Sequence, residues 1–220
     1  MTLLEIQLTI QQIFQLLGKP LEMSLEQYNN YLRMAQDEVF KEFVHGYMSG
    51  NGATVDSRVE QAIAPFRQNG FISGATSAYS GVDAISYSMP SDMYVLLSAV
   101  LVYNTVAYPN KTKRVDVVVD NEFAERMGNA ITYPQSDYPI GIYDKINLRL
   151  YVFPIISPTP SLNIICLYRP TTPILVETIT NGVRTQSASS TALQLDSMFH
   201  VDVIRKILQY LGVSIGNEFI

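Results

Sequence analysis

Few residues in this sequence have the chemistry that catalysis or transition-metal binding requires. It contains two histidines, His45 and His200, and one cysteine, Cys166. Neither histidine has a second His or a Cys at the spacing of a metal site, so we expect His45 to stabilise a helix end and His200 to lie on a helix surface. Cys166 lies in an apolar run, which predicts a packed thiol, and a lone cysteine excludes an internal disulfide.

Acidic residues are densest at Asp116, Asp120 and Glu122. Carboxylates that lie this close in the sequence can bind a divalent cation. However, Asp120 and Glu122 also come at the expected start of a short helix, where negative charge stabilises the first turn. The sequence therefore favours helix capping over a metal site at these residues.

The only basic run is KTKR, which contains Lys111, Lys113 and Arg114. These side chains could contact DNA phosphates or an acidic partner protein. A solvated turn before a strand is the commoner explanation of such a run and needs no ligand. Both interpretations stay open from the residues alone.

Motifs of the common enzyme classes are absent from the sequence. It has no glycine-rich phosphate-binding loop, no paired zinc ligands and no nucleophile elbow. We therefore predict that the protein is not an enzyme and has no catalytic residues, no metal and no cofactor. Two alternatives remain: a small enzyme with a site assembled from scattered polar groups, and a nucleic-acid-binding accessory protein that uses the KTKR residues.

The composition indicates a surface that binds other proteins. The chain is 47% hydrophobic and only 16% charged, below the roughly 25% charged residues of an average soluble domain. Its fourteen tyrosines and eight methionines suit subunit interfaces, whose centres are poor in charge. The net charge of −5 argues against a protein that holds phosphates over a broad surface.

The elements that must position these residues begin with helices. Thr2 with Glu5 forms a capping-box signal before a first amphipathic run, and Ser24 with Gln27 forms another before a longer run. We expect these two helices to form an antiparallel pair, followed by a third, short helix within 57–66. Polar residues interrupt the first run, so it is expected to be neither a signal peptide nor a membrane span.

The middle of the chain has the patterns of a β-rich segment. Residues 67–81 are rich in Gly, Ser, Ala and Asn, which predicts a flexible connector or a segment that a partner orders. The apolar run Met93–Tyr108 fits either a strand or a buried helix. A short helix capped by Asp120 is expected after the KTKR run. Strands are expected at 82–88, 114–119, 140–143, 146–153 and 162–169.

A hairpin over 174–186 has the strongest turn signal, because Asn181-Gly182 is the dipeptide that tight primed turns prefer. Both of its faces are mostly polar, so the hairpin is expected to protrude and dock on another protein. Its candidate interface residues are Ile179, Asn181, Gly182 and Val183.

The last element is an amphipathic helix within 196–220, capped by Asp196 or Ser197. We expect it to pack on the N-terminal helices. Phe199 and Tyr210 are its candidate interface residues.

Together these patterns predict an α+β fold with N- and C-terminal amphipathic helices packed as a bundle, a central antiparallel β-rich segment and a protruding β-hairpin. The expected divisions are a helical part at 1–66, a flexible connector at 67–81, a β-rich part at 82–195 and the C-terminal helix at 196–220. These parts are expected to form one composite domain.

Several segments resemble one protein family. They are YSMPSDMY, the long stretch RVDVVVDNEFAERMGNAITYPQSDYPIGIYDKINLRLYVFP, LNIICLYRPTTPI, and the end LQLDSMFHVDVIRKILQYLGVSIGNE. The turn, the short helix with Glu122, Phe123 and Arg126, the spaced prolines and the acidic-capped final helix together resemble head-to-tail connectors of short-tailed phages. These are adaptors of the tail tubular protein A type, and the resemblance is closest to neck ring proteins of crAss-like phages.

The resemblance implies a structural virion protein rather than an enzyme. It implies a dodecameric ring stacked under the portal protein, with neighbouring neck or tail proteins and with double-stranded DNA passing through the channel. The protein would be made in the host cytoplasm and would reside in the neck of the virion, with no membrane partner. The residues fit such a ring, because cyclic assemblies need two different interfaces on every subunit and a negative balance lets DNA pass without binding.

Overall fold

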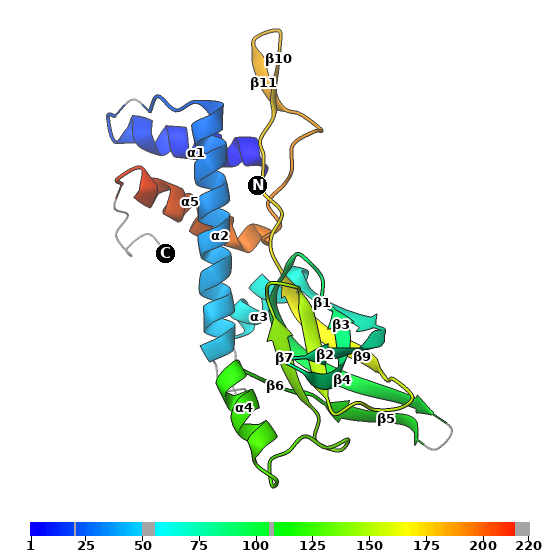
Figure 1. The fold of residues 1–220 in the computed structure, drawn as a ribbon. Helices are drawn as coiled ribbons and strands as arrows, with labels where there is room; N and C mark the ends of the chain where they lie inside the picture. The colour runs from blue at the N-terminus through cyan, green and yellow to red at the C-terminus, as the bar shows by residue number, and fades with distance from the viewer. Residues whose placement is uncertain (20, 50–55, 106–107, 214–220) are drawn as a thin grey trace. The chain divides into compact units, whose positions relative to one another are not determined.

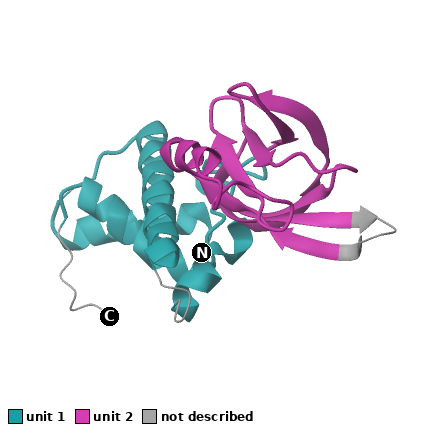
Figure 2. Ribbon diagram, turned by 60° about the horizontal axis from the view of Figure 1, so that its bottom comes forward, with its two compact units in different colours: residues 1–66, 170–220 teal, residues 67–169 magenta. Residues whose placement is uncertain are grey.

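The computed structural model describes residues 1–19, 21–49, 56–105 and 108–213. Within these ranges the α+β class is confirmed: five α-helices and two short 3-10 helices accompany eleven strands in three sheets, which are mostly antiparallel. The chain divides into two compact units, one made of Met1–Phe66 with Pro170–Ile220 and the other of Arg67–Arg169 (Figure 2). The segment 174–186, expected within the β-rich part, belongs to the helical unit.

The first unit contains the helices and one two-stranded sheet. Its elements are α1 (Leu3–Leu16), α2 (Leu25–Ser49), α3 (Ser57–Ile63), η1 (Ala64–Phe66), β10 (Glu177–Thr180), β11 (Val183–Gln186), η2 (Ser197–Phe199) and α5 (His200–Tyr210). Both capping boxes are present. The Glu5 N–H donates to the Thr2 hydroxyl at 3.2 Å, and the Gln27 N–H donates to the Ser24 hydroxyl at 3.2 Å.

The core of this unit lies between α5 and the two long helices. α5 packs along α2 and also contacts α1, whereas α1 lies across α2 instead of beside it (Figure 1). The expected antiparallel pair of α1 and α2 is therefore wrong. The apolar stripe of α5 is buried, and α5 contacts both α2 and α1. Tyr28 links the crossing helices, because its hydroxyl donates to the Leu3 carbonyl at 2.8 Å.

Two extended arms, 170–176 and 187–195, lead to and from the β10–β11 hairpin, and side-chain amides of α2 hold them. The Asn29 amide donates to the Leu175 carbonyl at 3.0 Å and accepts from the Leu175 N–H at 2.8 Å. The Gln36 amide bonds both arms, donating to the Thr171 carbonyl at 2.9 Å and accepting from the Gln194 N–H at 3.2 Å. Two side chains on one helix thus satisfy backbone groups that no strand pairs.

The second unit consists of two packed sheets and one helix, α4 (Asp120–Gly128). The four-stranded sheet has the order β1-β9-β4-β5 and the five-stranded sheet the order β2-β3-β8-β7-β6, with β6 and β7 parallel. The strands are β1 (Arg67–Ile72), β2 (Gly74–Tyr79), β3 (Val82–Ser88), β4 (Met93–Thr105), β5 (Tyr108–Arg114), β6 (Asp116–Val118), β7 (Ile140–Asp144), β8 (Arg149–Phe153) and β9 (Ser161–Tyr168).

Apolar side chains from both sheets form one core. Ile85 and Leu150 of the five-stranded sheet belong to the same buried cluster as Leu101 and Ile164 of the four-stranded sheet. The opposite face of the five-stranded sheet is covered by α4, through the buried ring of Phe123. The sheets therefore pack face to face, and α4 closes the outer face of one of them.

The segment 67–81 is not a flexible connector but contains the strands β1 and β2. β1 pairs with β9, which is distant in the sequence, and β2 pairs with the adjacent strand β3. These pairings fix the segment as strands, although its composition predicted a flexible connector. Small residues are needed here for packing. A Cβ atom on Gly74 would lie 2.6 Å from the Ile85 Cγ2 atom.

Other expected boundaries also change. Met93–Tyr108 contains the strand β4, which lies between β9 and β5, although residues 106–107 are outside the described residues. The KTKR run lies within β5 instead of a turn, and the strand expected at 114–119 is limited to β6. The alternation over 146–153 yields a strand only from Arg149, because Asp144 holds Ile146 and Asn147 in a turn through their N–H groups.

Candidate functional site

Of the two histidines and the one cysteine, His200 and Cys166 are buried. In the part of the chain that the structure describes, no group of three or more His, Cys, Asp or Glu side chains could hold a metal ion. Cys166 is buried, as expected, and burial raises the pKa of its thiol. His45 is exposed near the end of α2.

His200 is buried, which corrects the expectation of a helix-surface position. Its Nε2 atom lies 3.3 Å from the Leu195 carbonyl oxygen, which can only accept, so the ring carries its proton on Nε2. Its Nδ1 atom is buried without a hydrogen-bond partner. Burial lowers the pKa of this imidazole, because charge is costly away from water. The side chain joins the second arm of the hairpin to α5.

The acidic residues expected to cap α4 have other partners. The Asp120 carboxylate accepts from the Tyr79 hydroxyl at 2.8 Å, and no side chain caps the helix start at Val119. Arg126 forms ion pairs with Asp116 at 2.7 Å and with Glu122 at 2.5 Å. The hydrogen bonds to Glu122 and Asp116 raise the pKa of Arg126. These contacts fix α4 to the end of the sheet.

The basic run supplies two lysines to one carboxylate. Lys113 and Lys111 contact Asp137 at 2.8 Å and 3.3 Å. Their hydrogen bonds lower the pKa of Asp137. Arg114 is exposed. Because Lys111 and Lys113 share a counter-ion within the chain, this surface is less cationic than the sequence indicates.

Of the two candidates at the C-terminal helix, Phe199 is buried and Tyr210 is half-buried. Phe199 is 0% exposed and packs edge-on against Phe43, with ring centroids 4.8 Å apart, so it is a core residue and not an interface residue. Tyr210 donates its hydroxyl to Glu38, and burial together with this bond raises its pKa to about 12. Sequence periodicity identified an apolar stripe but did not tell which neighbour covers it.

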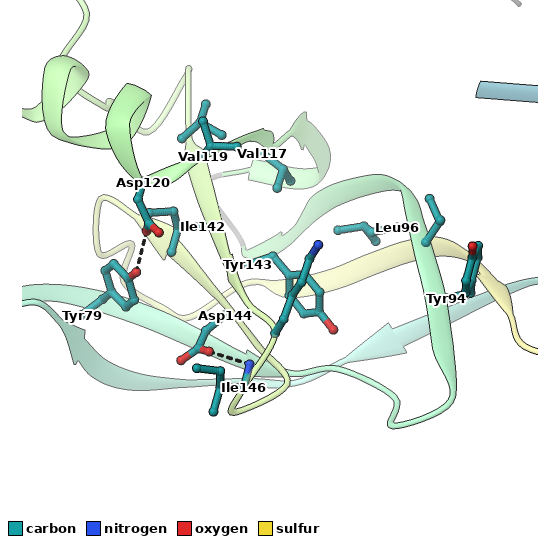
Figure 3. A pocket seen from close by; sticks show the side chains of 13 residues that line it. Tyr79, Tyr94, Leu96, Val117, Val119, Asp120, Ile142, Tyr143, Asp144 and Ile146 are labelled. Carbon is teal, nitrogen blue, oxygen red and sulfur yellow. Dashed lines mark hydrogen bonds between the residues drawn. The ribbon is translucent and has the colours of Figure 1, made fainter. Parts of the chain in front are cut away.

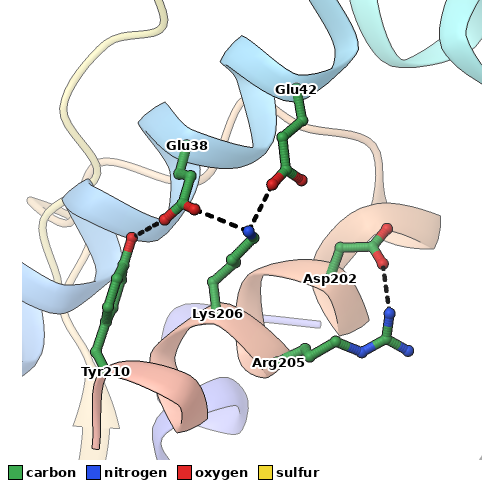
Figure 4. Close-up of polar contacts among 6 residues, drawn as sticks. All are labelled: Glu38, Glu42, Asp202, Arg205, Lys206 and Tyr210. Carbon is green, nitrogen blue, oxygen red and sulfur yellow. Dashed lines mark hydrogen bonds and ion pairs between the residues drawn. The ribbon is translucent and has the colours of Figure 1, made fainter. Parts of the chain in front are cut away.

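Beside Tyr210, one lysine joins α5 to α2 (Figure 4). Lys206 donates to Glu38 at 2.8 Å and to Glu42 at 2.5 Å. These bonds raise the pKa of Lys206, and the bond from Lys206 lowers the pKa of Glu38. Residues 168 positions apart in the sequence thus form one polar cluster on the helical unit.

The β10–β11 hairpin keeps its candidate residues on the surface. Asn181 has a φ of 52° and Gly182 a φ of 77°, which is the geometry of a tight primed turn. Ile179 is 67% exposed and Val183 is 61% exposed. Within the described residues no third strand pairs with β10 or β11. The hairpin therefore presents both faces and two unpaired edges.

A groove in the second unit was not indicated by the sequence. It has a volume of about 730 Å³, and four separate segments line it (Figure 3). They are the end of β2, the start of β4, the connection from β6 to α4, and the end of β7 with its turn. A groove made from segments so far apart leaves no local signal in the sequence.

The groove is apolar with acidic groups beside it. Val119 is 70% exposed and Ile146 is 92% exposed. Asp120, Asp144 and Lys145 are also among its lining residues, so acidic groups outnumber basic ones. The side-chain and backbone bonds from Asn147 lower the pKa of Asp144, so this carboxylate stays charged at neutral pH. Such a surface suits a partner with aliphatic and basic side chains.

Comparison with known proteins gives no family. No protein-family model matches the chain, and none of the curated proteins compared with it gives a match. Among the helices in the described ranges, none has both the length and the apolar character needed to cross a bilayer.

Proposed function

We propose that this chain is a structural virion protein: a ring-forming head-to-tail connector that lies under the portal and lines or surrounds the DNA exit channel. Its partners are further copies of the chain, the portal protein and neighbouring neck or tail proteins. It acts in the virion neck, after synthesis in the host cytoplasm, and performs no catalysis. The sequence motifs that resemble phage connectors are the first support for this proposal.

The observation that carries the proposal is the presence of exposed aliphatic residues on two different surfaces of one chain. One is the narrow hairpin, with Ile179 on one face and Val183 on the other, and the second is the groove with Val119 and Ile146. Large exposed aliphatic residues that gather at a surface mark interaction sites. Two unlike surfaces suit head-to-tail contacts, which close into rings when the rotation between subunits allows it.

The sheet edges supply further docking elements. β1 and β2 are the first strands of their sheets, so each has one edge without a neighbour in the described residues. Phe71 on β1 is also exposed. Edge strands readily accept a strand from another chain. The segment 67–81, expected to dock as a flexible connector, can therefore dock as preformed strands.

The net negative charge and the paired lysines suit a protein that lets DNA pass without binding it. Phosphate affinity depends on Lys and Arg contacts that release counter-ions. Two of the three basic candidates, Lys111 and Lys113, already contact Asp137. This pairing favours the connector over a DNA-binding accessory protein that would use the same run.

Native mass spectrometry and negative-stain imaging of the full chain test the proposal, with and without portal protein. We expect closed rings of a single stoichiometry, alone or on the portal. A chain that stays monomeric at the highest accessible concentration, both alone and with portal protein present, would contradict it.

A further inference from the structure

The β10–β11 hairpin is a two-stranded sheet whose edges have no further strand in the described residues, so it could bind to another surface. In the β10–β11 register Ile179 is opposite Arg184, so these two side chains share one face, and Val183 is on the other face. Arg184 is half exposed, and its ion pair with Glu177 spans 3.9 Å. A two-stranded ribbon gains little stability by itself in water. Contact with a further surface would bury Ile179 and Val183 and could give Arg184 a second acidic partner.

The groove of the second unit has the complementary chemistry. Val119 and Ile146 are exposed aliphatic residues, matching Ile179 and Val183 of the hairpin in kind. Asp120 and Asp144 outnumber Lys145, the one basic residue that lines the same groove, so the groove has a net negative charge, opposite in sign to Arg184. In Figure 3 the labelled Val119 and Asp120 lie at the start of α4, and Asp144 and Ile146 lie at the end of β7 and in the turn after it.

From this match we infer that the β10–β11 hairpin of one copy binds in the groove of a second copy of the chain. The ribbon enters the groove so that both of its faces are in contact: Ile179 on one face and Val183 on the other contact Val119 and Ile146. Arg184, on the same face as Ile179, lies near the groove carboxylates. The inference deepens the proposed ring and rests on it, because it assigns the head-to-tail contact to a named pair of surfaces. Since the two surfaces differ, each copy offers one hairpin and one groove, and the contact repeats from subunit to subunit.

Cysteine crosslinking between separate copies tests the pairing. One batch carries Val183→Cys in the hairpin and the other carries Ile146→Cys in the groove, and a short bis-maleimide is added after mixing. We expect a crosslinked dimer in the mixture that is much stronger than in either batch alone. Leu16→Cys replaces the groove variant in the control, because Leu16 is similarly exposed but lies on α1. The unmodified chain gives the background from the buried Cys166.

Two charge-introducing variants measure the same contact without a crosslinker. Ile179→Asp and Ile146→Lys both change exposed side chains, so each variant is expected to keep its fold, which circular dichroism checks. Each is expected to weaken self-association by about tenfold or more, because a charge is placed in an apolar contact. Leu16→Asp is the matched control and should leave the association constant unchanged.

The outcomes separate this inference from the proposed ring. Rings without the hairpin–groove crosslink would overturn the pairing and leave the connector standing. A crosslinked pair in a protein that forms no ring with or without portal would leave the pairing standing and overturn the connector. In a double variant, a crosslink that forms within one chain at any dilution would overturn the pairing between copies. A hairpin crosslink that forms only to added portal protein would overturn it as well.

Discussion

Two hairpins in this protein have the same turn and opposite surroundings. β2–β3 turns at Ser80 and Gly81, whose φ angles are 49° and 80°, and β10–β11 turns at Asn181 and Gly182, whose φ angles are 52° and 77°. β3 is paired on its other side by β8, and most of its side chains are buried. β10 and β11 are mostly exposed and pair only with each other in the described residues.

In these two hairpins the geometry of the turn and the stability of the strands have different causes. A two-residue turn with positive φ values is set by two residues and needs no tertiary contact. The stability of the strands depends on what packs against them. β2–β3 receives those contacts from its own sheet. The arms of β10–β11 are held by amides of α2, and its base is held by α1, whose Leu4 N–H donates to the Gln186 side chain at 3.3 Å. The inferred second copy supplies the remaining contacts to β10–β11.

The largest difference is expected from the same substitution in each hairpin. Ile85→Ala removes a side chain that is 0% exposed and leaves a cavity in the core, so it should reduce the free energy of unfolding by about 2–5 kcal/mol. Ile179→Ala changes a side chain that is 67% exposed and should stay within about 0.5 kcal/mol. Urea unfolding of the monomeric chain measures both. Equal losses would show that β10–β11 is packed as tightly as β2–β3.

A smaller effect is expected at the base of the second hairpin. Asn29→Ala leaves the N–H and carbonyl of Leu175 without their amide partner, which should cost about 1–3 kcal/mol. Amide exchange should accelerate over 175–186 and stay unchanged over 82–88. Asn30→Ala on the exposed side of α2 is the matched control, with no expected change. Unchanged protection of 175–186 in Asn29→Ala would refute the clamp.

The smallest effect is a pH dependence at the second arm of the hairpin. Burial lowers the pKa of His200 below its ordinary value of 6.5, so the unfolded chain binds this proton at a higher pH than the folded chain. The His200 contribution to stability is therefore complete above pH 6.5 and is lost as the pH falls through the lowered pKa. Urea unfolding between pH 7 and pH 5 should show this decline.

Substitution isolates the His200 contribution from that of other groups. His200→Gln should flatten the decline between pH 7 and pH 5, because the titrating ring is gone. His45→Gln removes an exposed histidine and should keep the decline. A parallel decline in all three proteins would assign the pH dependence to carboxylates instead.

Local signals in the sequence succeeded where one or two residues decide the structure. The capping boxes at Thr2 and Ser24 correctly predicted the starts of α1 and α2, since the bonds they form span three residues. The same local approach missed the turn at Ser80 and Gly81, because the small residues around it were interpreted as a flexible connector. These residues form the strands β1 and β2, which are ordered because they pair with β9 and β3.

The candidate site was predicted less well than the fold. Ile179 and Val183 are exposed, in agreement with their expected place on a polar hairpin. Phe199 was misassigned to an interface, because helical periodicity identifies an apolar face without identifying what covers it. The groove was missed entirely, since Ile146 was assigned to a strand that begins only at Arg149.

Local features of this protein could be predicted from neighbouring residues: the helix starts at Thr2 and Ser24, the Asn181-Gly182 turn and the low charge. The tertiary structure alone decided which apolar faces are covered, which charges are paired and which segments form the groove. The physical reason is distance along the chain. A cap or turn involves neighbouring residues, whereas the pairing of Lys206 with Glu38 joins residues 168 positions apart.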